Sequence, residues 1–165
     1  MKIAGTVVAA ITILSAPPTA CALCSYRGQD NAKTTVSQEF GDAKWVVKAK
    51  VLSASDHWSD ADDSWTLYDL EVTHAFKGKP AKRLHFFTFR DSGGFYMDRP
   101  WVPLPAGHDI GGEYLLFLNP VEPVRGHPAL ATGAVFVNYA CGQSGPWMDV
   151  PPSSKSTLAS LERAR

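Results

Sequence analysis

The chain has 165 residues, of which 45% are hydrophobic and 19% charged, and its 16 Lys and Arg residues balance 16 Asp and Glu residues. A protein that follows nucleic-acid phosphates needs a basic surface, so this balance argues against nucleic acid as a partner. The length suits one domain with one hydrophobic core.

The first 22 residues have the three regions of a signal peptide. Lys2 gives the positive start, residues 3–16 form an apolar run, and two prolines precede the small residues that end at Ala22. About fourteen apolar residues are too few for a permanent membrane anchor. We therefore predict cleavage after Ala22, which leaves residues 23–165 as a single exported domain, periplasmic or secreted.

The position of this cleavage decides which cysteines remain. A cut after Ala22 removes Cys21 and leaves Cys24 and Cys141. In an oxidising compartment such a pair is expected to form a disulfide. The alternative is a cut after Ala20, in the manner of a bacterial lipoprotein, although Pro18 stands where that motif normally has Leu. Only in that case, with Cys21 lipidated, would the protein be anchored to a membrane.

Alternating apolar and polar residues predict strands in the rest of the chain. The pattern is clearest over residues 67–76, where Tyr68, Leu70 and Val72 fall on one face. Composition predicts four more strands, at residues 44–53, 84–89, 113–118 and 134–139. Gly- and Pro-rich links separate them, so we expect a mainly β fold in which five strands close a barrel. The predicted core consists of Trp45, Val47, Leu70, Val72, Phe86, Leu116 and Val135.

Two short helices are predicted outside the barrel. Leu158 and Leu161 are three residues apart, and Ser154 can act as an N-cap, which favours a short C-terminal helix over residues 155–164. Residues 34–40 can form one or two helical turns, which Gly41 is expected to end.

The first candidate binding segment is the link between the first two strands. It contains Asp56, His57, Trp58, Asp60, Asp62 and Asp63. Carboxylate oxygens at this density could hold calcium, whereas the simpler alternative is a solvated acidic hairpin tip. In barrels of this architecture the loop commonly contacts ligands.

The second candidate binding segment is residues 95–101. Its binding candidates are Phe95, Tyr96, Arg99 and Trp101. Aromatic residues and Arg are the usual anchors of protein interfaces. The same residues could instead cover the open end of the barrel.

No catalytic motif is present in the sequence. The serines lack a Gly-x-Ser-x-Gly turn, and the five histidines are scattered without the paired spacing of zinc sites. We therefore expect a protein that is not an enzyme and that has no catalytic residues, no cofactor and no metal site.

Several segments together resemble a known family. Residues 40–51, 68–72 and Phe76-Lys77-Gly78 are similar to the inhibitory domain of tissue inhibitors of metalloproteinases (TIMPs) and to netrin-like modules, in their bacterial form. Residues 112–117 and 141–144 extend the resemblance to most of residues 24–147, and Phe-Lys-Gly is its most specific part. The resemblance implies a five-stranded Greek-key oligonucleotide/oligosaccharide-binding (OB) barrel that binds without catalysis. It also places Cys24 and Cys141 where that family has its second cysteine and the partner of that cysteine.

The resemblance leaves three functions open. The preferred one is an exported binding module that docks on a protein partner through its N-terminal edge and the two candidate segments. The second is a metalloprotease inhibitor, in which the amine and carbonyl of a first cysteine bind the protease zinc. Here the family's Cys-x-Cys becomes Cys21-x-x-Cys24, and cleavage after Ala22 removes Cys21. The third is a small ligand or glycan bound on the barrel face.

Overall fold

The structure, a computed structural model, describes residues 24–59, 64–90, 93–121 and 128–164. The predicted leader, its cleavage site and Cys21 lie outside these residues. So do Asp60, Asp62 and Asp63 of the first candidate segment. No helix in the described part of the chain is long and apolar enough to cross a membrane.

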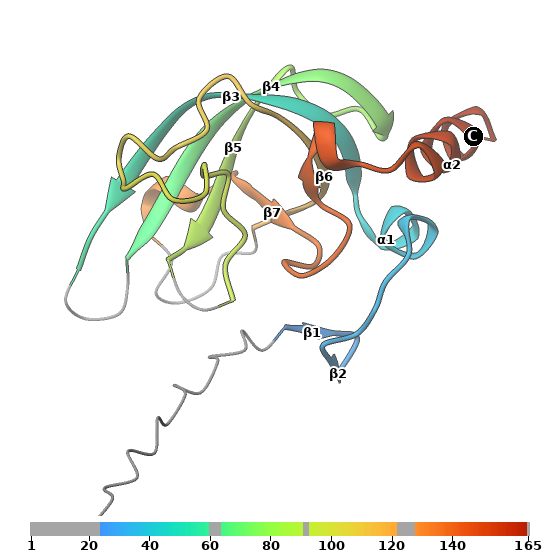
Figure 1. Cartoon of the computed structure of the whole chain (residues 1–165), viewed down its shortest axis with the longest axis horizontal. Coiled ribbons are helices and arrows are strands. Elements are labelled where there is room, and N and C mark those ends of the chain that lie inside the picture. Colours follow the sequence, from blue (N-terminus) through green and yellow to red (C-terminus); the bar gives the residue numbers. More distant parts are fainter. Residues whose placement is uncertain (1–23, 60–63, 91–92, 122–127, 165) are drawn as a thin grey trace, which may run out of the picture.

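Five strands close a barrel, as the sequence predicts (Figure 1). The strands are β3 (Trp45–His57), β4 (Trp65–Lys77), β5 (Arg83–Phe89), β6 (Glu113–Pro120) and β7 (Val135–Val137). They pair in the order β3-β4-β5-β7-β6, and β6 pairs back onto β3 to complete the ring. The β5–β7 pair is parallel and the other pairs are antiparallel. The short strand β8 (Gly145–Pro146) pairs with Tyr114 and Leu115 of β6, on the edge of β6 opposite β3. The arrangement is that of an OB-like barrel.

The predicted core lies inside this barrel. Val47, Leu70, Phe86, Leu116 and Val135 are buried, and the two remaining members, Trp45 and Val72, are partly buried and pack against them. The strands β3 and β4 are longer than predicted. The last four residues of β3, after residue 53, are small or polar, so the apolar signal stops there although pairing with β4 continues to His57.

Two helices lie together at one end of the barrel, at the right of Figure 1. They are α1 (Val36–Asp42) and α2 (Pro152–Arg163), and Phe40 and Leu158 bury their side chains in a second apolar cluster between the helices and the barrel. The predicted cap at Ser154 is wrong. Because the fixed φ of proline suits the first helical position, α2 begins at Pro152, and Ser154 lies inside the helix.

The predicted end of α1 at Gly41 is also wrong, because the helix continues to Asp42. At its N-terminus, Thr35 and Gln38 form a reciprocal capping box. At its C-terminus, the Lys77 Nζ donates to the carbonyl oxygens of Phe40 and Gly41, at 2.6 and 2.9 Å. This ammonium satisfies backbone acceptors that a helix end leaves open, which stabilises the last turn.

The Phe76-Lys77-Gly78 motif therefore has a structural role in this chain. Phe76 packs against the second apolar cluster, and Lys77 caps α1. Gly78 has a φ of 78°, and a Cβ at this position would lie 2.7 Å from the Trp45 ring. The motif turns the chain after β4 and joins the barrel to α1.

The predicted disulfide between Cys24 and Cys141 is confirmed, with the two Cα atoms 6.0 Å apart. It ties the N-terminal hairpin of β1 (Ser25–Tyr26) and β2 (Gln29–Asp30) to the segment after β7. Two side-chain contacts support the same junction. The Tyr139 hydroxyl donates to the Ala32 carbonyl at 3.1 Å, and Tyr26 donates to the Asp42 carboxylate.

A buried carboxyl group lies beside this junction. Glu39 of α1 has no exposed surface, and its Oε1 accepts hydrogen bonds from the Thr34 hydroxyl and, at 2.8 Å, from the Gln143 backbone N–H. Among the described residues its Oε2 has no hydrogen-bond partner. Gly142 makes this approach possible, because a Cβ there would lie 2.1 Å from Oε1. Burial raises the pKa of Glu39 above its ordinary value despite these hydrogen bonds.

We expect the free energy of unfolding of the Glu39→Gln variant to increase relative to that of the wild-type protein as the pH rises. Because the folded state raises the pKa of Glu39, the folded protein binds more protons than the unfolded chain between the two pKa values, so stability falls as the pH rises above the ordinary glutamate pKa of about 4.3. The amide of the variant does not titrate. Thermal unfolding of both proteins from acid to neutral pH measures the difference, with Glu71→Gln as a control on the half-exposed surface of β4. A difference that does not vary with pH would contradict this assignment.

Candidate functional site

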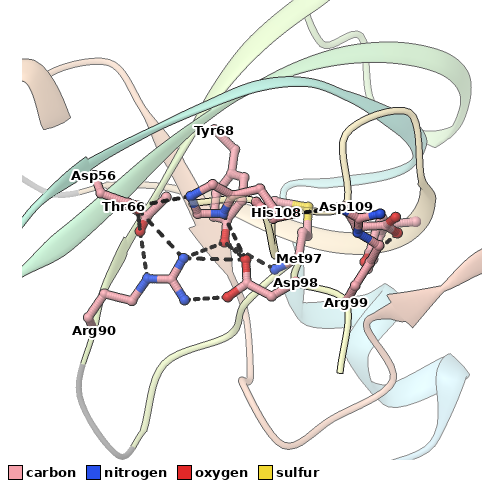
Figure 2. A network of polar contacts seen from close by, with 11 residues as sticks. Asp56, Thr66, Tyr68, Arg90, Met97, Asp98, Arg99, His108 and Asp109 are labelled. Atoms are coloured by element: carbon pink, nitrogen blue, oxygen red, sulfur yellow. Dashed lines mark hydrogen bonds and ion pairs between the residues drawn. The ribbon is translucent and has the colours of Figure 1, made fainter. Parts of the chain in front are cut away.

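The structure brings parts of the two predicted binding segments together at one polar network (Figure 2). Asp56 lies near the end of β3, Arg90 follows β5, and Asp98 and His108 lie in the long connection from β5 to β6. The neighbouring strand β4 adds two hydroxyl groups, those of Thr66 and Tyr68.

His108 is at the centre of the network. Its Nε2 lies 2.9 Å from Oδ2 of Asp56, and its Nδ1 lies 2.9 Å from Oδ1 of Asp98. Its side chain is only 4% exposed. Two carboxylates, which accept hydrogen bonds, therefore face the two nitrogens of one buried imidazole ring.

Arg90 forms the second half of the network. Its guanidinium pairs with Asp98, donates to the Tyr68 hydroxyl at 3.0 Å, and lies 3.7 Å from Oδ1 of Asp56. Its Nε donates to the Thr66 hydroxyl at 2.6 Å, and that hydroxyl donates to Asp56. Asp56 and Asp98 therefore each contact both Arg90 and His108.

Two aromatic rings flank the Arg90 guanidinium, one from each candidate segment. The guanidinium carbon lies 4.6 Å from the centre of the Tyr96 ring and 6.0 Å from that of Trp58. Both distances fall within the range of a cation–π interaction. Tyr96 and Trp58 thus both lie against the same cation.

The pKa directions follow from burial and from these contacts. Burial opposes the ionisation of Asp98, but hydrogen bonds from Arg90, His108 and Tyr68 outweigh it and hold the pKa of Asp98 below its ordinary value. Burial is also the main reason that the pKa of Tyr68 is raised. Because the pKa of Asp98 is lowered in the folded state, its contribution to stability is present above about pH 4 and is lost as the pH falls through the folded pKa.

The network fixes both ends of one surface loop. Asp98 and His108 face each other as an isolated β-bridge, and the nine residues between them form a closed turn that we call the loop tip (residues 99–107). The Arg99 N–H donates to the Gly107 carbonyl at 2.7 Å, and the Gly107 N–H donates to the Pro103 carbonyl at 2.8 Å. A Cβ at Gly107 would lie 2.2 Å from the Val102 carbonyl oxygen. The loop tip is therefore tightly folded on itself.

Trp101 projects from the loop tip into solvent. Its residue surface is 100% exposed, and its backbone is in the left-handed region with a φ of 67°. This conformation is unfavourable for a bulky residue and persists only where the surroundings enforce it. The folded loop tip thus presents the largest side-chain type, fully exposed, on a defined backbone.

The other residues predicted for binding divide between the core and the surface. Phe95 packs against the barrel core and Met97 is fully buried, so the first half of the second segment covers the barrel end. Arg99 and Trp101, in the second half, are exposed. The exposed His57 stacks on Trp65 of β4 with a 5.2 Å centroid distance and does not join the network.

Asp56 differs from the prediction of an acidic loop tip, because its side chain is only 8% exposed and it contacts the network. Within the described ranges, no group of three or more His, Cys, Asp and Glu side chains is placed to hold a metal ion. The calcium hypothesis otherwise depends on Asp60, Asp62 and Asp63, which the structure does not describe.

Sequence reasoning did not identify Arg90, His108, Thr66 and Tyr68 as members of a common site. The sequence around a single histidine or arginine does not show which distant residues its side chain contacts. One signal was available for β3, because Ala54 and Asp56 continue the alternation of the strand beyond residue 53, in register with Tyr68 and Thr66 of β4.

The contacts of the network favour a structural role, in which it holds the loop tip in place, over a role for His108 as a general base. A histidine between an acid and a nucleophile can serve as a general base, but both nitrogens of His108 contact carboxylates and neither is directed at a hydroxyl or thiol group. The same contacts hold the two ends of the loop tip against β3 and β4.

A scan against protein-family models and a search of curated proteins both find no match for this chain. The resemblance to the TIMP and netrin-like group therefore remains an interpretation of the sequence segments described above.

Proposed function

We propose that this chain is an exported, non-catalytic binding module that docks on a protein partner through its loop tip. The observation that carries the proposal is Trp101, which is fully exposed, in a left-handed conformation, on a loop whose ends are fixed by a buried polar network. The resemblance to netrin-like modules supports the same class of function.

An interface would use this arrangement in two ways. A Trp side chain buries on the order of 150–250 Å² when it is covered, and Trp is among the commonest hot-spot residues of protein interfaces. Because the loop tip is already folded, binding orders few additional groups, which lowers the entropic cost of association. The buried network thus supports a preformed contact surface.

The composition of the loop tip indicates the chemistry of the partner surface. Exposed Arg99 and Val102 flank Trp101, and residues 99–107 contain no acidic side chain. A complementary surface has an apolar pocket for the indole and carboxylates at its rim for the guanidinium. The partner is therefore proposed to be a protein with an acidic rim around an apolar pocket.

Two features support the exported location within this proposal. The N-terminal residues have the pattern of a signal peptide, and the Cys24–Cys141 disulfide is of a kind that persists in oxidising compartments. The inhibitor alternative depends on residues before Cys24, which lie outside the described part of the chain.

The substitution Trp101→Ala tests this proposal. Residues 23–165 with the disulfide intact are immobilised and used to isolate a partner from the extracytoplasmic fraction of the source organism, and the affinity of the purified partner is then measured. We expect Trp101→Ala to weaken binding by about 30-fold or more, as for a hot-spot residue. Met148→Ala is the matched control, because Met148 is 86% exposed and lies outside the loop tip.

Equal affinity of the wild-type protein and the Trp101→Ala variant would overturn the proposal. The same variant is tested for sedimentation with anionic lipid vesicles. Binding of the wild-type protein to vesicles that depends on Trp101, without a protein partner, would assign the loop tip to membranes instead.

A further inference from the structure

A pocket of about 600 Å³ opens in the barrel wall at a place distinct from the loop tip. It lies where β5 and β7 separate. These two strands pair only at Phe86 and Val135, whereas β5 continues to Phe89 with β4 as its partner. The end of β6 and the segment Gly93–Phe95 form the remaining walls. The pocket thus results from the short β7 strand, which closes the ring with a single residue pair.

The described pocket wall is largely apolar, and phenylalanine is its commonest residue. Five phenylalanines line it, and they come from β5, β7 and the segment after β5: Phe86, Phe87, Phe89, Phe95 and Phe136. Phe86 and Phe95 make an edge-to-face contact with centroids 6.0 Å apart, which holds the inner wall in a defined geometry. Phe136 is 38% exposed, at the side of the pocket that faces solvent. Aromatic walls of this kind pack well against the faces and edges of another ring system.

None of the described residues that line the pocket is charged. Its polar side chains are those of Thr88 and Asn119. Both ends of the Asn119 amide are already used, because Oδ1 accepts from the Lys44 N–H at 2.9 Å and Nδ2 donates to Asn138 at 2.9 Å. Among these described residues a charged ligand would find no counter-ion to replace its lost hydration, which is costly. An uncharged ligand would avoid this cost.

We propose that this pocket binds one uncharged, largely aromatic small molecule. Its volume lies within the range of about 300–1,000 Å³ that is typical of small-molecule sites, and its wall has the usual composition of many apolar and few polar groups. A ligand that covers the apolar part of this wall removes it from water, which favours a ligand that is itself apolar. The site is independent of the docking function, since no residue of the loop tip lines it.

The probe for this proposal is N-phenyl-1-naphthylamine, an uncharged aromatic dye that fluoresces in apolar surroundings. We expect saturable binding of one dye molecule per chain to residues 23–165 with the disulfide intact. The anionic analogue 8-anilinonaphthalene-1-sulfonate has the same rings and adds a sulfonate, so we expect it to bind about tenfold or more weakly. Equal affinity for the two dyes, or no saturable binding, would overturn the proposal.

A pair of variants locates the binding site. Phe136→Asp places a charge at the pocket wall and should weaken dye binding by about tenfold or more, because an uncharged ring would lie against a carboxylate. Met148→Asp introduces the same group at an exposed position outside the pocket and should bind like the wild-type protein. Unchanged binding by Phe136→Asp would place the dye elsewhere and refute the assignment.

Two further measurements keep the test decisive. If Phe136→Asp has a reduced thermal midpoint, Ala140→Phe is used in its place, since a larger side chain at this lining position should block the dye without adding charge. Sedimentation equilibrium without dye shows whether the pocket is occupied by a second copy of the chain. A dimer that Phe136→Asp converts to a monomer would overturn the small-molecule assignment.

Discussion

Replacing Arg90 with methionine should lower the free energy of unfolding by about 3–5 kcal/mol, because the substitution leaves two largely buried carboxylates without their guanidinium partner. Asp56 and Asp98 both contact the Arg90 guanidinium, and the Asp56 side chain is only 8% exposed. Methionine keeps much of the apolar stem of arginine, so the loss reports mainly on charge and hydrogen bonding. Urea unfolding of residues 23–165 measures it.

Arg83→Met is the matched control for this prediction. Arg83 lies at the other end of β5 and is exposed, so its replacement should change stability by less than about 0.5 kcal/mol. The double variant Arg90→Met/Asp98→Asn tests the proposed cause. Asp98→Asn removes the carboxylate charge that Arg90 neutralises. In the double variant it should therefore restore part of the free energy of unfolding that Arg90→Met removes, with a coupling energy of about 1 kcal/mol or more. Additive effects of the two substitutions would show that the ion pair is not the source of the destabilisation.

The barrel could be predicted from sequence because its signal is local. In β4, Tyr68 and Leu70 alternate with half-exposed polar residues, and this period of two residues is visible without knowledge of the partner strands. Cys24 and Cys141 were likewise predicted to pair, since only two cysteines remain after cleavage at the predicted site. Such inferences need no information about which distant residues meet.

The polar network could not be predicted in this way. His108 and Asp56 are separated by 52 residues, and they meet only because β3 extends beyond its apolar portion and the β5–β6 connection returns across the barrel end. The second candidate segment shows the same limit. Barrel cover describes its first half, where Met97 is buried, whereas Trp101 in its second half is exposed and its role as an interface anchor stays a prediction.

The most specific part of the family resemblance is explained by folding. Lys77 caps α1, and Gly78 has a left-handed backbone close to the Trp45 ring. These roles join a strand to a helix and involve no binding partner. The resemblance therefore bears more directly on the barrel than on the partner, and the functional proposal depends mainly on the loop tip.

Removing the Cys24–Cys141 disulfide should lower the free energy of unfolding by about 4–5 kcal/mol, the value that the chain-entropy model gives for a loop of this length. The two cysteines are 117 residues apart, so the bridge excludes many extended conformations from the unfolded ensemble. The variant with both cysteines changed to alanine, and the wild-type protein after reduction, should lose similar amounts of stability in urea unfolding.

Hydrogen exchange should then show which part of the fold depends on the disulfide. The Tyr26 hydroxyl still holds the N-terminal hairpin, and the Tyr139 hydroxyl holds Ala32 just after it. We expect the hairpin amides nevertheless to exchange faster than those of β3 and β4 once the covalent link is absent. The Lys44 to Trp45 region at the start of β3 serves as an internal reference. A loss of less than about 1 kcal/mol, with unchanged exchange in the hairpin, would mean that these noncovalent contacts alone define the N-terminal junction.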